Sequence, residues 1–294
     1  SKILKQADKA DKLKADYLMI VDVSMKDAET PAITLGIRGL CAFTVELKGS
    51  NSDLHSGIYG GIVYNPLHAL VEMLASLRDS NGRITIPGFY NQVSTPSEEE
   101  LSCISFDFDQ DQLKKDFNAS STGGEKNLSP LERSWLRPTL EINGITGGYG
   151  GPGTKTVIAA QAQAKLSCRL VPNQDPRQIT QLIKNYIESL APKGIEVNCT
   201  IHEGMGKPVR TSPSSKLVKA LAASCGKVYS QPAAYIYDGA TIPIATELQE
   251  ASQSEVVFFG LALPTDKIHA PNECFGWDRI RNGFLILCDA LSQL

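Results

Sequence analysis

The chain has 294 residues, of which 42% are hydrophobic and 21% are charged, values that are typical of a globular protein. Its net charge of −3 gives no broad basic surface, so we expect neither nucleic acid nor an anionic membrane as a partner. The sequence has no apolar run of about 18 residues and no signal-peptide core near its start, which predicts a cytoplasmic protein without a membrane span.

The seven cysteines predict no disulfide framework. Their number is odd, no Cys-x-x-Cys pair occurs, and most of them lie within apolar patterns. This usage is typical of reduced core cysteines in a cytosolic protein.

The first predicted element is a strand over residues 15–22, a short apolar run that ends with the carboxylate of Asp22. In α/β sheets such a position is a common place for a ligand. A second strand is predicted over 41–49, where apolar and polar residues alternate so that one face is wet. The next loop, residues 52–61, contains His55 before three glycines, a setting that belongs to neither a helix core nor a strand core.

The middle of the chain predicts a separate α+β unit. Apolar residues at helical spacing indicate a helix over 65–78, and a polar excursion with short helices follows over 80–130. Alternation over 157–172 predicts one long strand whose polar face ends at Arg169. A helix over 175–190 and a strand over 195–204 complete the unit. We expect a small antiparallel sheet with helices on one face.

From about residue 208 the pattern changes. It indicates a helix that ends before Gly226, a short helix within 237–248 that Thr241 caps, an apolar strand over 255–263 and a final helix from near Asp278. A fully apolar strand between helices is typical of a parallel sheet. We therefore predict an α/β fold that is formed by residues 1–36 and 208–294, with the α+β unit inserted as residues 37–207.

Two residues of the α/β parts are candidate metal ligands. Asp22 ends its strand and His269 lies in the loop over 267–273, and an aspartate with an imidazole suits zinc, manganese or cobalt. Two ligands are too few for a zinc site, which takes three protein ligands and a water. The alternatives are a helix cap or turn for Asp22 and a solvated loop histidine for His269.

Three further features could bind an anion. Arg169 on a wet strand face could pair with a carboxylate through two hydrogen bonds, or form an ordinary surface ion pair. The glycine-rich residues 147–155, just before Thr156, match neither the P-loop nor a dinucleotide fingerprint, so nucleotide binding is not expected. The turn at 238–243 could present a helix N-terminus to an anion, or be an ordinary capped helix.

Several motifs together resemble one family, the carnosine-dipeptidase-like branch of the aminoacylase and dipeptidase zinc peptidases. They are SDLHSGIYGG (52–61), LERSWLRPTLEINGITGGYGGPGTKTVI (131–158), AKLSCRLVPNQDP (164–176), DGATIPI (238–244) and HAPNE (269–273). The excursion IPGFYNQVSTPSEEE (86–100) is also typical of this branch. The resemblance implies a zinc-binding α/β catalytic domain that is interrupted by an α+β lid domain, through which the protein forms a homodimer.

The resemblance also assigns roles to single residues. It implies two divalent metal ions, zinc with manganese or cobalt as alternatives, which a carboxylate and a water bridge, with Asp22 as a ligand of one metal and His269 as a ligand of the other. His55 would reach into the partner subunit's site and stabilise the oxyanion of the tetrahedral intermediate. Arg169 would clamp the substrate's C-terminal carboxylate, and Thr156 would support contacts on the lid side.

The remaining implied substrate contacts are Gly239 and Ala240, which would touch the substrate backbone, and Lys207, which stands where relatives often have a histidine that contacts substrate. The family's His-x-Asp motif, its bridging aspartate and its Glu-Glu pair precede the strand that ends at Asp22. SKILKQ (1–6) resembles the helix just after that pair. We therefore expect this chain to be the C-terminal portion of such an enzyme, inactive alone because the general base is missing.

The expected substrate is a dipeptide or a related N-acyl amino acid. Two alternatives stay open. One is a deacylase or desuccinylase of the same family, and the other is a non-enzymatic protein that dimerises or binds peptides.

Overall fold

The computed structural model describes residues 12–294, which form two compact units. Unit 1 contains the chain up to Arg38, Thr95–Phe108 and Pro208–Leu294, and unit 2 contains Gly39–Ser94 and Asp109–Lys207. The helix that SKILKQ resembles lies outside the described residues. No described helix is both long enough and apolar enough to cross a bilayer.

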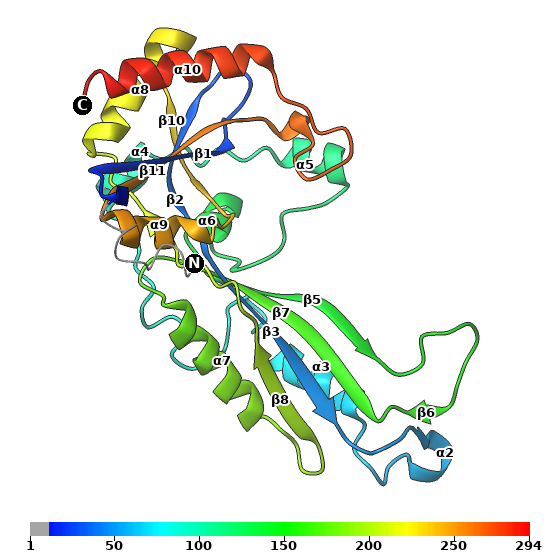
Figure 1. The fold of residues 1–294 in the computed structure, drawn as a ribbon. Coiled ribbons are helices and arrows are strands. Elements are labelled where there is room, and N and C mark those ends of the chain that lie inside the picture. Colours follow the sequence, from blue (N-terminus) through cyan, green and yellow to red (C-terminus); the bar gives the residue numbers. More distant parts are fainter. Residues whose placement is uncertain (1–11) are drawn as a thin grey trace. The chain divides into compact units, whose positions relative to one another are not determined.

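Unit 1 is built on a mixed sheet (Figure 1). Its strands, in spatial order, are β1 (Tyr17–Ser24), β11 (Glu255–Ala262), β2 (Ala32–Ile37) and β10 (Ala234–Asp238), and the short β9 (Val209–Arg210) also pairs with β2. β1 is parallel to β11 and β10 is parallel to β2, but β11 and β2 are antiparallel. The expected parallel arrangement therefore holds within two strand pairs and not across the whole sheet.

Helices cover both faces of this sheet. α8 (Lys216–Tyr229) and α10 (Trp277–Leu291) pack against each other on one side, and α9 (Ile244–Ser252) lies on the other (Figure 1). Ala245 of α9 belongs to the same core cluster as Val256 and Phe258 of β11. Successive side chains of β11 thus pack alternately against the helices on the two faces of the sheet, which is why the sequence of that strand is apolar at almost every position.

Two sequence-based expectations for unit 1 were wrong. α8 continues through Gly226 because the packing of buried Leu221 and Cys225 outweighs the low helix propensity of one glycine. Thr241 does not cap α9, which begins at Ile244 without a side-chain cap; its hydroxyl donates instead to the Arg38 carbonyl at 2.7 Å.

One segment of the excursion belongs to unit 1, although the sequence suggested a single inserted block over 37–207. Ile104 forms an isolated parallel bridge with Tyr235, and the Ser105 N–H donates to the Tyr235 carbonyl at 3.1 Å. Lys26 pairs with Asp107 at 3.0 Å. These contacts attach residues 95–108, including α4 (Glu98–Cys103), to β10 and to the segment between β1 and β2.

Unit 2 has the antiparallel sheet with helices on one face that the sequence predicted. The strand order is β5 (Thr139–Gly147), β7 (Gln161–Leu170), β3 (Gly39–Lys48), β8 (Glu196–Ile201). α3 (Pro66–Ser76) contacts β7 and β3, and α7 (Pro176–Ser189) contacts β8 and β3. Phe43, Leu166 and Ile183 are fully buried in the core that these elements enclose. The short helices α5 (Gln110–Phe117) and α6 (Pro130–Trp135) lie in the excursion.

The predicted long strand over 157–172 is two strands. β6 (Val157–Ile158) pairs with β4 (Leu54–His55), and β7 starts only at Gln161. The break falls where the Ala160 N–H donates to the Asp53 carboxylate at 3.0 Å and the Ala160 carbonyl accepts from Gly49 at 2.9 Å. At these bonds the chain leaves its pairing with β4 and begins its pairing with β3 and β5. The alternation of apolar and polar residues could not predict this break, because it depends on residues more than 100 positions away.

All seven cysteines are free, and four of them are buried. Burial raises the pKa of the Cys199 thiol to about 11 and that of Cys225 to about 12, because it disfavours the thiolate. These cysteines act as small apolar core residues, as expected, whereas Cys103, Cys274 and Cys288 are exposed.

Candidate functional site

The predicted site residues divide between the two units. Unit 1 contains Asp22, Gly239, Ala240 and His269, and unit 2 contains His55, Thr156, Arg169 and Lys207.

Asp22 and His269 lie at the same end of the unit 1 sheet. Asp22 is near the carboxyl end of β1, and His269 is in the loop that leaves the carboxyl end of the neighbouring parallel strand β11. The Met25 N–H donates to the Ala262 carbonyl at 2.8 Å, which ties the two strand ends together. Both side chains are exposed. The carboxyl ends of parallel strands are the usual place for ligands in α/β sheets.

The donor chemistry of these two residues fits a divalent metal, but their number does not complete a site. A zinc centre takes three protein ligands and a water. Within residues 12–294, no three His, Cys, Asp or Glu side chains come together as a group that could hold a metal ion. Asp22 and His269 can therefore be only part of a ligand set.

The turn that contains Gly239 and Ala240 is fixed by Arg38 and Asp238. The Arg38 guanidinium donates to the Gly239 carbonyl and the Arg38 N–H donates to the Ala240 carbonyl, both at 3.0 Å. The Ala240 N–H donates to the Asp238 carboxylate at 2.7 Å. β10 runs antiparallel to β11, so this turn lies at the sheet end opposite to the loop of His269. Substrate contact by Gly239 and Ala240 stays a prediction.

His55 and Thr156 lie together at one end of unit 2. The β4–β6 ladder pairs His55 with Val157, and the Ser56 N–H donates to the Thr156 carbonyl at 3.0 Å. The His55 ring accepts the Gly57 N–H at 3.0 Å and so caps the short helix α2 (Ser56–Tyr59). That bond occupies Nδ1 and leaves Nε2 as the ring nitrogen available to a ligand. His55 and Thr156 are both exposed.

Arg169 and Lys207 lie at the other end of unit 2. In the register of β3 and β7, Arg169 is opposite Leu40, and Leu40 also exchanges backbone hydrogen bonds of 2.8 and 2.9 Å with Gly206. This brings Lys207 to the same strand end as Arg169. Arg169 is half-buried on the polar face of the sheet, and Lys207 is exposed.

The four residues of unit 2 thus form two pairs that the length of a strand separates. β7 runs from Gln161, at the end near His55, to Arg169, which is eight residue steps or about 27 Å at about 3.4 Å per step. Figure 1 shows α2 and β6 beyond the far ends of β3 and β7. His55 and Arg169 of one chain therefore cannot contact the same dipeptide.

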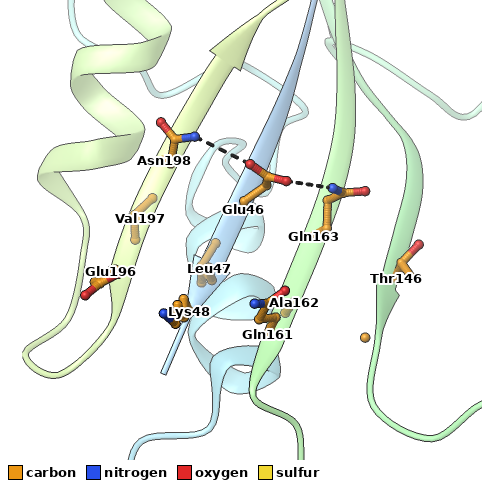
Figure 2. Close-up of a pocket in the computed structure, with 11 residues that line it drawn as sticks. Glu46, Leu47, Lys48, Thr146, Gln161, Ala162, Gln163, Glu196, Val197 and Asn198 are labelled. Atoms are coloured by element: carbon orange, nitrogen blue, oxygen red, sulfur yellow. Dashed lines mark hydrogen bonds between the residues drawn. The ribbon is translucent and has the colours of Figure 1, made fainter. Parts of the chain in front are cut away.

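The polar face of the unit 2 sheet forms an open groove of about 610 Å³ (Figure 2). Glu46 lies at its centre and accepts hydrogen bonds from the amides of Gln163 at 3.1 Å and Asn198 at 3.4 Å, on the strands to either side. None of the eight predicted residues lines this groove. Glu46, Gln163 and Asn198 thus bond to one another, and the groove is part of the polar, solvent-exposed face of the sheet.

Sequence reasoning missed the residues that hold the predicted ones in place. Arg38 fixes the turn at 239–240, Asp53 sets the break before β7, and a buried pair of Asp266 with Arg279 lies beneath the loop of His269. Each of these residues contacts a partner that is distant in the sequence or lies across a loop, so no local sequence pattern identifies it. The pKa of the Asp266 carboxyl is lowered because Arg279 donates hydrogen bonds to its ionised form.

Comparison with known proteins gives matches along almost the whole chain. Residues 35–195 match the family model of the peptidase dimerisation domain of M20 peptidases. A Beta-Ala-His dipeptidase of Rattus norvegicus is 33% identical over 274 residues, a match that covers 92% of this chain and 56% of that protein. A Cys-Gly metallodipeptidase of Schizosaccharomyces pombe is 29% identical over 287 residues, which are 96% of this chain and 60% of that protein.

A solved structure shows the same fold. The M20 family metallo-carboxypeptidase of Sulfolobus solfataricus superposes with a TM-score of 0.83 at 31% identity, over 97% of this chain and 65% of that one. The chain thus spans less than two thirds of the length of each of these three proteins.

Proposed function

The chain belongs to the M20 peptidases, the family that carries this dimerisation domain, and on that premise we propose that the protein is a metal-dependent hydrolase of dipeptides. The observation that carries the proposal is the position of Asp22 and His269 at one end of two parallel strands. Asp22 and His269 would hold part of a centre with two divalent cations, zinc or alternatively manganese or cobalt. When bound, such ions activate a water and polarise the scissile carbonyl. A cytoplasmic location stays a prediction.

We further propose that the remaining ligands and the general base come from polypeptide that corresponds to the unmatched part of the relatives. Two surfaces of unit 1 support this. β1 pairs only with β11 among the described strands, so its outer edge presents backbone groups that another strand could pair with. α10 presents an apolar stripe to solvent, with Trp277 84%, Phe284 67% and Leu291 58% exposed. A strand beside β1 and a helix beside α10 would bury both surfaces.

The activity test compares this chain with the complete protein. We expect the complete protein with added Zn²⁺ or Mn²⁺ to hydrolyse β-Ala-His or Cys-Gly, the dipeptides in the names of the relatives. This chain alone should hydrolyse neither, because two ligands do not form a zinc centre. Turnover by this chain alone would contradict the proposal. Cleavage of N-acyl or N-succinyl amino acids in preference to dipeptides would indicate a deacylase, and no turnover by either form would indicate the non-enzymatic alternative.

Arg169 is proposed to bind the substrate's C-terminal carboxylate. Its guanidinium offers a planar pair of donors that matches a carboxylate, and Lys207 at the same strand end adds positive charge. We expect Arg169→Ala in the complete protein to lower kcat/KM for a dipeptide about 10²-fold or more, as for loss of a charged hydrogen-bond pair. The C-terminal amide of the same dipeptide should lose far less. Equal losses for the acid and the amide would contradict this role.

We propose that the protein acts as a homodimer and that His55 serves the site of the other subunit. The distance of about 27 Å between the two ends of unit 2 supports this, since a substrate bound at Arg169 is out of reach of His55 in the same chain. An imidazole from a second copy could donate a hydrogen bond to the oxyanion that forms during hydrolysis. Thr156 would support the backbone around that imidazole through its bond to Ser56.

An uncovered surface of unit 2 suits a second copy. β5 pairs only with β7 among the described strands, so its other edge presents free backbone groups. Ile142 and Ile145 of β5 pair with core residues of β7 and so point to the helix side, yet they are 47% and 50% exposed. Val71 on α3 is 56% exposed. We call β5 with the outer face of α3 the dimer surface.

A further inference from the structure

The loop that carries His269 is closed at its base by one residue, Asp266. The Asp266 carbonyl accepts the Cys274 N–H at 3.0 Å, which joins the two ends of the segment 266–274. Its carboxylate accepts the Leu263 N–H at 2.8 Å, on the side where the chain leaves β11. Asp266 therefore closes the loop that contains His269 and ties its base to the chain that leaves β11.

The backbone of this loop is in an unfavourable conformation that needs support. Lys267, His269 and Asn272 have φ values of 57°, 60° and 64°, although none of them is a glycine. This left-handed region is less favourable for residues with a Cβ, although Asn and His adopt it more readily than most, so three such residues in one short loop gain from outside support. The loop tip has one internal backbone hydrogen bond, from Ala270 to Lys267 at 2.9 Å. The support must come from outside the tip.

Arg279 of α10 provides that support. Its guanidinium donates to the two carboxylate oxygens of Asp266 at 2.5 and 2.6 Å, and the two side chains are only 8% and 5% exposed. It also donates to the Leu261 carbonyl at 2.8 Å and lies 4.4 Å from the centre of the Phe275 ring. One planar group thus links β11, the loop and α10, which a lysine cannot do with the same geometry.

We propose that Asp266 and Arg279 are positioning residues for His269. Their buried ion pair would hold the loop in a single conformation and so keep the imidazole at the end of β11, beside the end of β1 that carries Asp22. The inference rests on the proposed role of His269 as a metal ligand. Groups that orient a metal ligand typically change metal affinity on the order of 10- to 100-fold.

The test uses the complete protein, in which the remaining metal ligands are expected to be present, with three variants and one control variant. Arg279→Met removes the donors but keeps an apolar stem, and Arg279→Lys keeps the charge without the planar pair. Asp266→Asn combined with Arg279→Met removes the buried carboxylate as well, in case the single variant fails to fold. Lys227→Met is the matched control, since it breaks another ion pair of α10, with Asp289 at 2.7 Å, far along the helix from the loop.

Two quantities are measured for each variant, the hydrogen exchange rates of the Ala270 and Cys274 amides, and the Zn²⁺ concentration that shifts the NMR signals of the His269 ring. Arg279→Met and the double variant should exchange these amides about tenfold faster or more and bind Zn²⁺ about tenfold more weakly, with exchange in β11 unchanged. Arg279→Lys should be intermediate, and Lys227→Met should match the unmodified protein.

If the Cys274 amide exchanges at an unchanged rate in Arg279→Met and in the double variant, the ion pair does not hold the loop in place. Faster exchange with unchanged Zn²⁺ affinity would leave only a structural role and would overturn the positioning role. If His269→Ala binds Zn²⁺ as tightly as the unmodified protein, the proposed metal role of His269 fails, and the positioning role fails with it. That result is separate from the exchange measurement, which reports on the loop alone.

Discussion

Asp266 and Arg279 show what single residues contribute and why the sequence hides some of them. Both are almost excluded from solvent, so each charge depends on the other. They are 13 residues apart, one in a loop and one on a helix, and no helical or strand spacing relates them. Asp22 and His269 could be proposed from the sequence because each follows an apolar strand and has a side chain that binds metals.

The pair predicts how stability depends on pH. Arg279 lowers the pKa of Asp266 in the folded chain, so the stabilisation is fully present above the unfolded value of about 3.9 and is lost as the pH falls through the folded pKa. At pH 7, Asp266→Asn leaves the Arg279 charge buried and should lower the free energy of unfolding by about 3 kcal/mol. Urea unfolding of both proteins from pH 7 to pH 3 measures this difference.

The difference in unfolding free energy between the unmodified chain and Asp266→Asn should stay constant down to about pH 4. It should shrink at lower pH, as the Asp266 carboxyl of the folded chain takes up its proton. A difference of the same size at pH 3 and at pH 7 would mean that the ionised carboxylate does not supply the stabilisation. Lys227→Met provides the control, because it breaks a more exposed ion pair, between Lys227 of α8 and Asp289 of α10.

At the scale of helices and strands, local patterns predicted the elements but not their partners. The helix over 65–78 and the strand over 41–49 appear as α3 and β3 with ends within a few residues. The strand over 157–172 was divided by hydrogen bonds to Asp53 and Gly49, and the apolar β11 has an antiparallel as well as a parallel neighbour. The pattern of apolar and polar residues in a strand shows which of its faces are buried, whereas the identity and direction of its neighbouring strands depend on residues far away in the sequence.

The dimer surface gives a prediction at this scale. Val71→Glu and Ile145→Lys each place a charge on the outer side of α3 or β5, where a second copy would bury it. Both variants should weaken self-association of the chain at least about tenfold, because an unpaired charge is costly in an interface. Sedimentation velocity over a range of concentrations measures this effect.

Phe117→Glu is the matched control for these variants. Phe117 is 74% exposed on α5 of the same unit, outside the dimer surface, so this variant should associate like the unmodified chain. All three side chains are exposed, so thermal stability should change little. If both Val71→Glu and Ile145→Lys dimerise as strongly as Phe117→Glu, the second copy binds elsewhere.

At the scale of the whole molecule, the family was accessible from the sequence, while the grouping of the site residues was not. The motifs around His55, Arg169 and His269 indicated the M20 peptidases, in agreement with the match over 35–195. The ladder that pairs His55 with Val157, and the register that puts Arg169 opposite Leu40, required the structure. Only these pairings show that the two residues lie at opposite ends of one unit.

That separation leads to the central claim, that a working site combines Arg169 of one subunit with His55 of the other. The complete protein can be prepared as mixed dimers by expressing two differently tagged chains together. One mixed dimer combines a His55→Ala chain with an Arg169→Ala chain. The control combines an unmodified chain with a chain that carries both substitutions, so both dimers contain the same changes in different arrangements.

The measurement is dipeptide hydrolysis by these two mixed dimers. If each site is shared between subunits, the first mixed dimer has one intact site and about half of the unmodified kcat per dimer, whereas the control is as inactive as the single-variant homodimers. The reverse result, an inactive first dimer and a half-active control, would place both residues in the site of one chain and would rule out a shared site.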